Sequence, residues 1–78
     1  MNAELQTIRQ DIDALDAAIA RLVQIRRAKS VKAQQVKRNE GLPAVDELRE
    51  RQIKQAYECQ SEGASAVAEA ILTYCRQP

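Results

Sequence analysis

The segment from Glu4 to Asn39 contains no proline and no glycine, and its apolar residues recur with the spacing of a helix. In its first half, residues alternately three and four apart form an apolar heptad seam, made of Leu5, Ile8, Ile12, Leu15, Ile19 and Leu22. A helix of this length spans about 54 Å, whereas a compact globule of 78 residues has a radius of gyration of about 12 Å. The rest of the chain is too short to cover such a helix, so we expect a second copy to cover it.

Two further helices are expected after the long one, each bounded by residues that stop or start helices. Gly41 suits the left-handed conformation that ends a helix, and Pro43 blocks continuation. Asp46 is a candidate N-cap for a second helix over 47–60, and a glycine-containing turn precedes a third helix over 65–76. The expected fold is therefore all-α, with one long helix and two short ones.

The composition fits a small helical domain that needs a partner for stability. The chain has two tyrosines as its only aromatic residues, two glycines and two prolines, so its core must be aliphatic and its backbone favours helices. Residues 1–78 form one domain at most, near the lower size limit for a self-sufficient core. Oligomerisation is the expected source of further burial, which again predicts a homodimer.

The residues that the sequence lacks argue against several classes of function. There is no histidine, and Cys59 and Cys75 do not have the CxxC spacing of zinc sites, so we expect no metal, no cofactor and no histidine-activated nucleophile. No signal-peptide segment and no apolar run of membrane-spanning length occurs, which predicts a cytoplasmic protein outside the membrane. The net charge of +1 argues against nucleic acid as a partner.

The second half of the long helix replaces the apolar seam with cations. The heptad register continues to Arg26 and Lys29, and the stretch from Arg26 to Arg38 contains six Lys/Arg and no acidic residue. Arg26 and Lys37 project from one face about 16 Å apart along the axis, a separation that can bracket a small dicarboxylate. Taken singly, each of these cations also fits a solvated surface position, where the aliphatic part of its side chain covers apolar surface.

Arg9 and Arg49 add cations from outside this stretch. Arg9 lies about 25 Å before Arg26 along the helix, too far to join the same small site in its own chain. If two long helices pair antiparallel, Arg9 of one copy lies toward the Lys37 end of the other, which predicts a composite site built from two chains. Arg49 sits in the first turn of a helix that must fold back across the first.

These residues form an ordered set along the chain. Its positions are Ile8-Arg9-x-x-Ile12-Asp13-x-Leu15-Asp16, Leu22-x-x-x-Arg26, Lys37 and Gly41-x-Pro43-x-x-Asp46-x-x-Arg49-Glu50. The set covers about residues 4–51 and resembles the all-helical (type II) chorismate mutase family. The resemblance implies three helices per chain in an intertwined homodimer, with two active sites that are each shared between the chains.

The activity that the resemblance implies is the Claisen rearrangement of chorismate to prephenate, a step of aromatic amino-acid biosynthesis. This isomerase reaction needs a dicarboxylate held in a compact conformation by cations, without a metal or general base. Carried over by position, Arg26 and the other chain's Arg9 hold substrate carboxylates, and Lys37 bonds a carboxylate and the ether oxygen. Gln34 stands where the family often keeps a small residue, which predicts an altered pocket wall.

On the second and third helices the resemblance implies four further site residues. Arg49 sits by the ring and ether region, Glu50 accepts from the substrate hydroxyl, and Asp46 is either a helix cap or a substrate contact. The family's late Ser-x-x-x-Gln pair, whose glutamine bonds the ether oxygen, is matched in spacing by Thr73-x-x-x-Gln77, which makes Gln77 a candidate catalytic residue. A protein partner that orders this short third helix is a candidate activator.

Two other interpretations stay open at this point. Isochorismate pyruvate lyases and aminodeoxychorismate mutases share the scaffold and much of the cationic set, and the sequence separates them poorly because all bind nearly the same dicarboxylate. The alternative of another class is a non-catalytic helical interaction module, with the stretch from Arg26 to Arg38 binding nucleic acid or an acidic partner. The near-neutral net charge and the lack of a recognisable DNA-binding motif argue against it.

Overall fold

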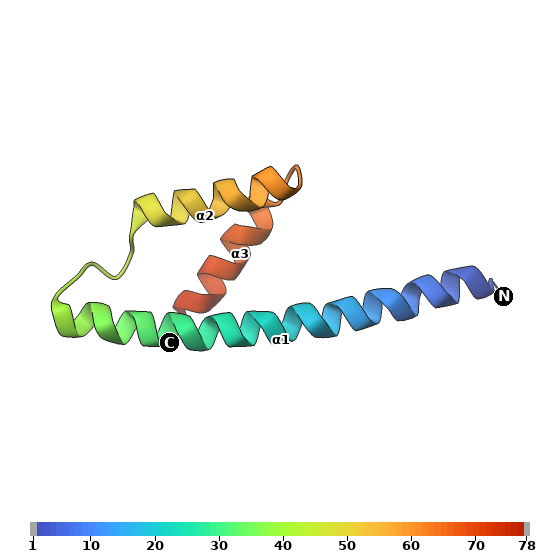
Figure 1. The fold of residues 1–78 in the computed structure, drawn as a ribbon, viewed down its shortest axis with the longest axis horizontal. Coiled ribbons are helices and arrows are strands. Elements are labelled where there is room, and N and C mark those ends of the chain that lie inside the picture. The colour runs from blue at the N-terminus through green and yellow to red at the C-terminus, as the bar shows by residue number, and fades with distance from the viewer. Residues whose placement is uncertain (1, 78) are drawn as a thin grey trace.

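The computed structural model describes residues 2–77 and contains three helices, α1 (Ala3–Glu40), α2 (Glu47–Gln60) and α3 (Ser65–Arg76) (Figure 1). No strand occurs within these residues, so the predicted all-helical class with one long and two short helices is confirmed. The predicted bounds of both short helices are also confirmed. The long helix extends one residue further at each end than its apolar pattern predicts.

Both ends of α1 are closed by hydrogen bonds typical of helix caps. The Asn2 side chain accepts a hydrogen bond from the Leu5 backbone N–H at 3.1 Å. At the other end, the N–H groups of Gly41 and Leu42 donate to carbonyls of the last turn at 3.3 and 2.8 Å, the paired bonds of a Schellman motif. Gly41 has a φ of 69°, which costs glycine less than other residues, so the predicted glycine stop is confirmed.

The start of α3 is capped by a side chain of the preceding helix. Ala64, the residue before α3, makes no side-chain cap. Instead, the Glu58 carboxylate accepts hydrogen bonds from the Gly63 N–H at 2.8 Å and the Ser65 N–H at 2.9 Å. These bonds, the Gly63 bond foremost, hold the pKa of Glu58 below its ordinary value because they favour the charged form.

We expect Glu58→Gln to lower the melting temperature at neutral pH, because a neutral amide is a weaker acceptor for these N–H groups. Since the folded-state pKa is the lower one, the stabilisation is complete above the ordinary pKa of glutamate and is lost as pH falls through the folded-state value. Thermal unfolding followed by circular dichroism should show the wild-type and variant melting temperatures converging at acidic pH. Glu62→Gln, at an exposed glutamate of the same turn, is the control. A gap that stays constant with pH would contradict the capping role.

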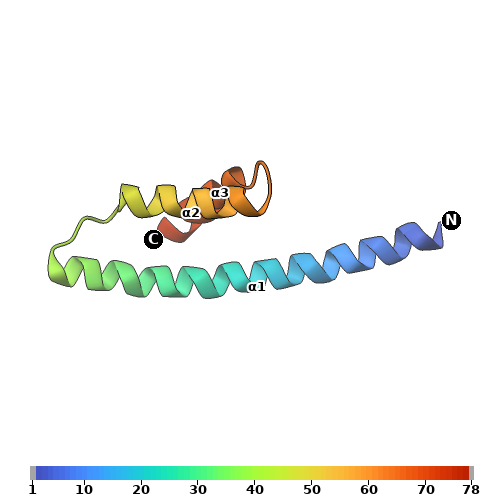
Figure 2. The same cartoon turned by 45° about the horizontal axis from the view of Figure 1, so that its top comes forward.

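The packing of the chain centres on α3. This helix contacts both α1 and α2, whereas α2 does not pack directly against α1. Figures 1 and 2 show α2 running alongside the C-terminal half of α1, with α3 crossing between them. Among the described residues the buried ones are Ala68, Leu72 and Cys75, all on α3. The core of a single chain is thus confined to one face of its last helix.

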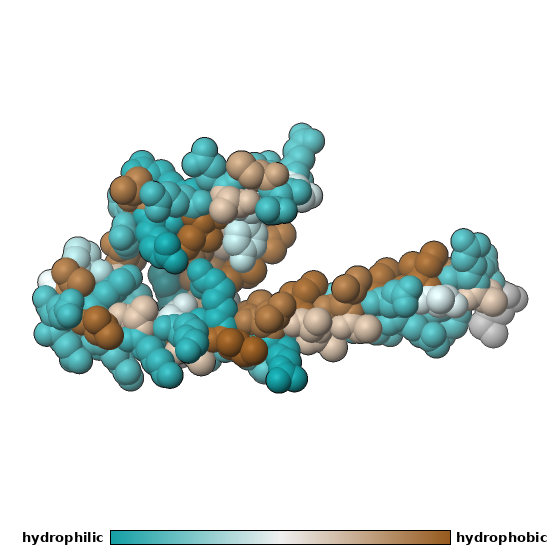
Figure 3. Space-filling model, in the orientation of Figure 1, coloured by the Kyte–Doolittle hydropathy of each residue, from teal (hydrophilic) through white to brown (hydrophobic). Residues whose placement is uncertain are grey.

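The first half of α1 extends away from the other two helices (Figure 1). The chain measures 59 × 24 × 14 Å, with a radius of gyration of 16.4 Å. Every residue of the apolar seam is exposed, with Leu15 at 62% and Leu22 at 64%, and Figure 3 shows the seam as an apolar row along α1. No helix within residues 2–77 combines the length and apolar character needed to cross a membrane. A continuous apolar row of this kind marks an interaction surface.

Candidate functional site

One pocket, with a volume of about 100 Å³, lies where α1, α3 and the start of α2 approach one another. Its charged and core-facing side chains are Arg26 and Lys37 from α1, Asp46, Arg49 and Glu50 from the start of α2, and Leu72, Cys75 and Arg76 from α3. The structure therefore brings together all the predicted site residues except Arg9 and Gln77, from segments that lie far apart in the sequence.

The two cations of α1 are held in the pocket by neutral acceptors. Both Arg26 and Lys37 are half-buried. Lys37 Nζ donates to the Ala44 carbonyl at 3.3 Å, and Arg26 donates to Ser30 Oγ at 3.5 Å. Gln34 donates to the same Ala44 carbonyl at 3.0 Å, so it ties α1 to the loop before α2. Within residues 2–77, neither Arg26 nor Lys37 pairs with a carboxylate, and both charges stay available for an anion.

Asp46 fixes the position of the α2 side chains. Its Oδ1 accepts a hydrogen bond from the Arg49 backbone N–H at 3.1 Å, so the predicted N-cap is confirmed, and the same residue lines the pocket. Glu50 follows in the first turn and is half-buried, whereas Arg49 is more exposed. Because a capping side chain sets where the helix begins, Asp46 determines where these two side chains meet the pocket.

α3 lines the pocket with residues that the sequence patterns did not single out. Leu72 and Cys75 are buried, and Arg76 forms an ion pair with Glu50. A signal for them was present in the sequence. One helical face carries positions i, i+4, i+7 and i+8, which here are Ala68, Leu72, Cys75 and Arg76.

Gln77 lies outside the pocket. It follows α3 in an extended backbone conformation, with φ −66° and ψ 138°, and lines an adjoining depression beside Arg38 that shares Cys75 and Arg76 with the pocket. The other member of the expected pair, Thr73, is exposed on α3. Arg76, at the end of α3, thus lines the pocket, whereas the extended backbone after the helix places Gln77 outside it.

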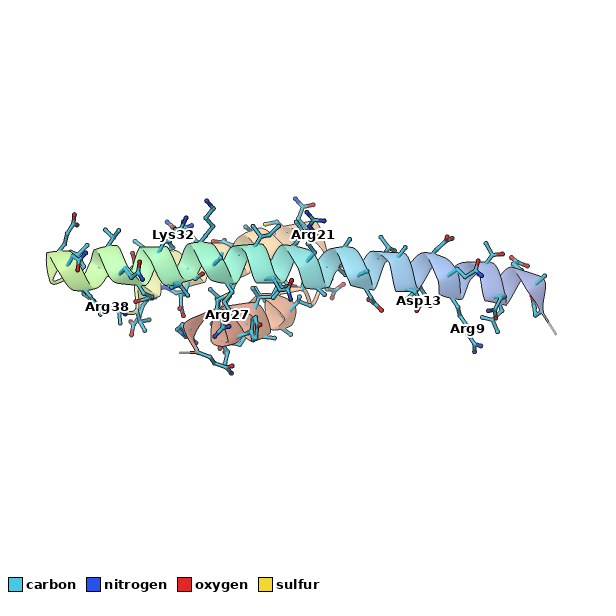
Figure 4. All side chains as sticks on the ribbon, turned by 90° about the horizontal axis from the view of Figure 1, so that it is seen from below. Arg9, Asp13, Arg21, Arg27, Lys32 and Arg38 are labelled. Carbon is cyan, nitrogen blue, oxygen red and sulfur yellow. The ribbon has the colours of Figure 1, made fainter. Side chains whose placement is uncertain are left out.

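Arg27 docks the end of α3 onto α1. Its guanidinium carbon lies 5.2 Å from the centroid of the Tyr74 ring, within the range of a cation–π contact, and it also donates to the Gln77 carbonyl oxygen at 3.1 Å. Figure 4 shows Arg27 beside α3, and Arg21 and Lys32 on the opposite edge of α1. Arg27 therefore helps to hold the α3 wall of the pocket in place.

Arg9 stands near the N-terminal end of α1 (Figure 4). It is exposed, and Figure 1 shows no other described element of the chain beside this part of the helix. The pocket begins at Arg26, about 25 Å further along the axis. Arg9 of the same chain cannot reach it.

The pocket carries an excess of positive charge. Four cationic side chains and two acidic ones leave two net positive charges, from Arg26, Lys37, Arg49 and Arg76 against Asp46 and Glu50. Such a balance complements a ligand with two negative charges.

The comparison with known protein families agrees with this arrangement. The family model described as chorismate mutase type II matches residues 8–77, a range that includes every charged side chain of the pocket. Searches of curated proteins and of solved structures returned no significant match. Because the family match covers well over half of the chain, the chain belongs to the chorismate mutase type II family.

Proposed function

We propose that this chain is a chorismate mutase that converts chorismate to prephenate in aromatic amino-acid biosynthesis. The observation that carries the proposal is the pair Arg26 and Lys37, two half-buried cations of one pocket that form no ion pair with a carboxylate within residues 2–77. Chorismate is a dicarboxylate, so its negative charge complements the net positive charge of the pocket side chains. Membership of the family supports the same activity.

The rearrangement requires no catalytic acid, base or nucleophile from the protein. The ether C–O bond breaks as a new C–C bond forms within one molecule, so no external proton or nucleophile takes part. The protein accelerates the step by holding the substrate in its reactive conformation and by placing positive charge where the ether oxygen gains electron density. Arg26 and Arg9 of the other chain hold the carboxylates, since arginine binds a carboxylate through two parallel hydrogen bonds. Lys37 bonds a carboxylate and the ether oxygen.

The start of α2 completes the site. Arg49 adds positive charge beside the ring and the ether oxygen, and Glu50 accepts a hydrogen bond from the substrate hydroxyl. Asp46 positions both through its cap, and its place on the pocket wall also lets it contact the substrate. Gln77 would have to turn toward the pocket to bond the ether oxygen, because its backbone leaves α3 in an extended conformation.

A homodimer supplies what one chain lacks. Two α1 helices packed antiparallel cover each other's exposed seams. The same pairing brings Arg9 of one chain toward the Lys37 end of the other. One intertwined assembly with two shared pockets therefore accounts for both the apolar row and the distant cation.

The proposal is tested by the loss of chorismate absorbance on adding purified protein, with identification of the product. Prephenate is the expected product. Pyruvate release from isochorismate, or conversion of the 4-amino analogue, without turnover of chorismate would instead identify a lyase or aminodeoxychorismate mutase on this scaffold. No turnover of any of the three, combined with DNA binding that falls steeply with salt, would identify an interaction module. A protein that raises the rate by binding α3 would be the expected activator.

A further inference from the structure

Arg76 places a positive charge of α3 in the pocket. α3 carries two charged side chains, Glu69 and Arg76, and only Arg76 lines the pocket. Its Nη1 atom pairs with Oε2 of Glu50, and the two side chains are 35% and 21% exposed. A guanidinium has five N–H donors, so the ion pair leaves Arg76 with donors for a further acceptor.

Linking α2 to α3 by an ion pair does not by itself explain why Arg76 lines the pocket. Lys54 and Glu69 already form an ion pair between the same two helices, and neither of them lines the pocket. Exposed pairs of this kind contribute little to stability. The Arg76–Glu50 pair differs because both partners face the space where an anion would bind.

The charge balance of the pocket gives Arg76 a role when a dianion enters. Without Arg76, the carboxylate of Glu50 would face the negative ligand unpaired, and like charges at short range repel. Arg76 removes this repulsion and presents its remaining N–H groups to the ligand. Glu50 in turn restricts the guanidinium to one side of the pocket, which reduces the side-chain entropy lost on binding.

We infer that Arg76 is a substrate-contacting residue, the donor that α3 contributes to the bound dicarboxylate, and that Glu50 holds it in place. This inference rests on the proposed function of the same pocket. Gln77, to which the sequence pattern assigns the donor of α3, follows the helix in an extended conformation and lines an adjoining depression but not the pocket, whereas Arg76 lines both. Arg76 precedes it by one residue and shares the face of α3 that carries Leu72 and Cys75.

Three variants test the contact. Arg76→Ala is expected to lower kcat/KM for chorismate about 100-fold, a loss typical of removing one donor to a reacting anion. Arg76→Lys keeps the charge and the pairing with Glu50 but loses the planar fork, and is expected to retain about a tenth of the wild-type value. Lys54→Ala breaks the other α2–α3 ion pair and is the matched control, expected to stay within about twofold of wild type.

Calorimetric titration with prephenate separates this inference from the proposed function. Weaker prephenate binding by Arg76→Ala than by Lys54→Ala supports the contact, whether or not the protein rearranges chorismate. Wild-type protein that binds prephenate without turning over chorismate overturns the proposed function alone. Equal rates and equal prephenate affinities in the two alanine variants overturn this inference alone, since both ion pairs then act only between helices. A wild-type protein that binds neither compound overturns both.

Discussion

Lys37→Ala and Arg26→Ala are each expected to lower kcat/KM for chorismate by about 1,000-fold, the upper range for loss of one group that stabilises developing charge. The fold should survive, because within residues 2–77 Lys37 donates only to the Ala44 carbonyl and Arg26 only to Ser30 Oγ, and α1 has no buried residue to disturb. The expected loss of activity therefore comes from weaker interaction with the substrate and not from unfolding. Steady-state kinetics would give the rates, and circular dichroism with sedimentation would show whether a folded dimer remains.

Matched controls come from the opposite edge of the same helix. Lys32→Ala and Arg21→Ala remove the same side-chain types from exposed positions on α1, outside the pocket (Figure 4). Both control proteins should keep the wild-type rate. Near-normal turnover in Lys37→Ala and Arg26→Ala alike would refute the mutase assignment.

A mixture of Arg9→Ala and Arg26→Ala chains is expected to regain about a quarter of the wild-type activity, although each protein alone is nearly inactive. In a mixed dimer, one pocket carries both substitutions and the other carries neither. Random exchange of equal amounts makes about half of the dimers mixed, each with one intact pocket of its two. The assay is chorismate turnover after the two proteins are incubated together, with exchange followed by native mass spectrometry.

The control for this experiment is a mixture of Lys37→Ala and Arg26→Ala chains. Both substitutions lie on the same chain's contribution to the pocket, so every pocket of a mixed dimer stays defective and no activity should return. Recovery in this control, or no recovery in the Arg9→Ala mixture despite demonstrated exchange, would show that the pocket is not shared as proposed.

The helix bounds could be predicted from sequence because the signals that start and stop helices are local. Gly41 is followed within two residues by Pro43, and the Asp46 side chain reaches only three residues ahead. The capping role of Glu58 was not predicted, because the hydrogen bonds that it makes are not local to one helix end. It caps a helix from the far side of a turn, at Gly63 and Ser65, and no short motif encodes that pairing.

The candidate site was predictable where one helix carries it. Arg26 and Lys37 share a face of α1 at any tertiary arrangement, so their spacing was enough to place them together. To predict which α3 residues line the pocket, one must also know which face of α3 is turned toward α1, and the sequence does not state this. Spacing alone favoured Gln77, whereas the pocket-lining face of α3 ends with the buried Cys75 and the more exposed Arg76. The place of Arg9 depends on a second chain and remains a prediction.

The single-chain core, Ala68, Leu72 and Cys75, has a consequence for any measurement of rate. So little buried apolar surface does not offset the conformational entropy of ordering three helices. Under the proposed assembly, folding and association are then one event, and stability depends on chain concentration. Diluting the enzyme removes structure and turnover together. A specific activity that falls at low enzyme concentration would report the monomer–dimer equilibrium, while the chemistry of each assembled pocket stays the same.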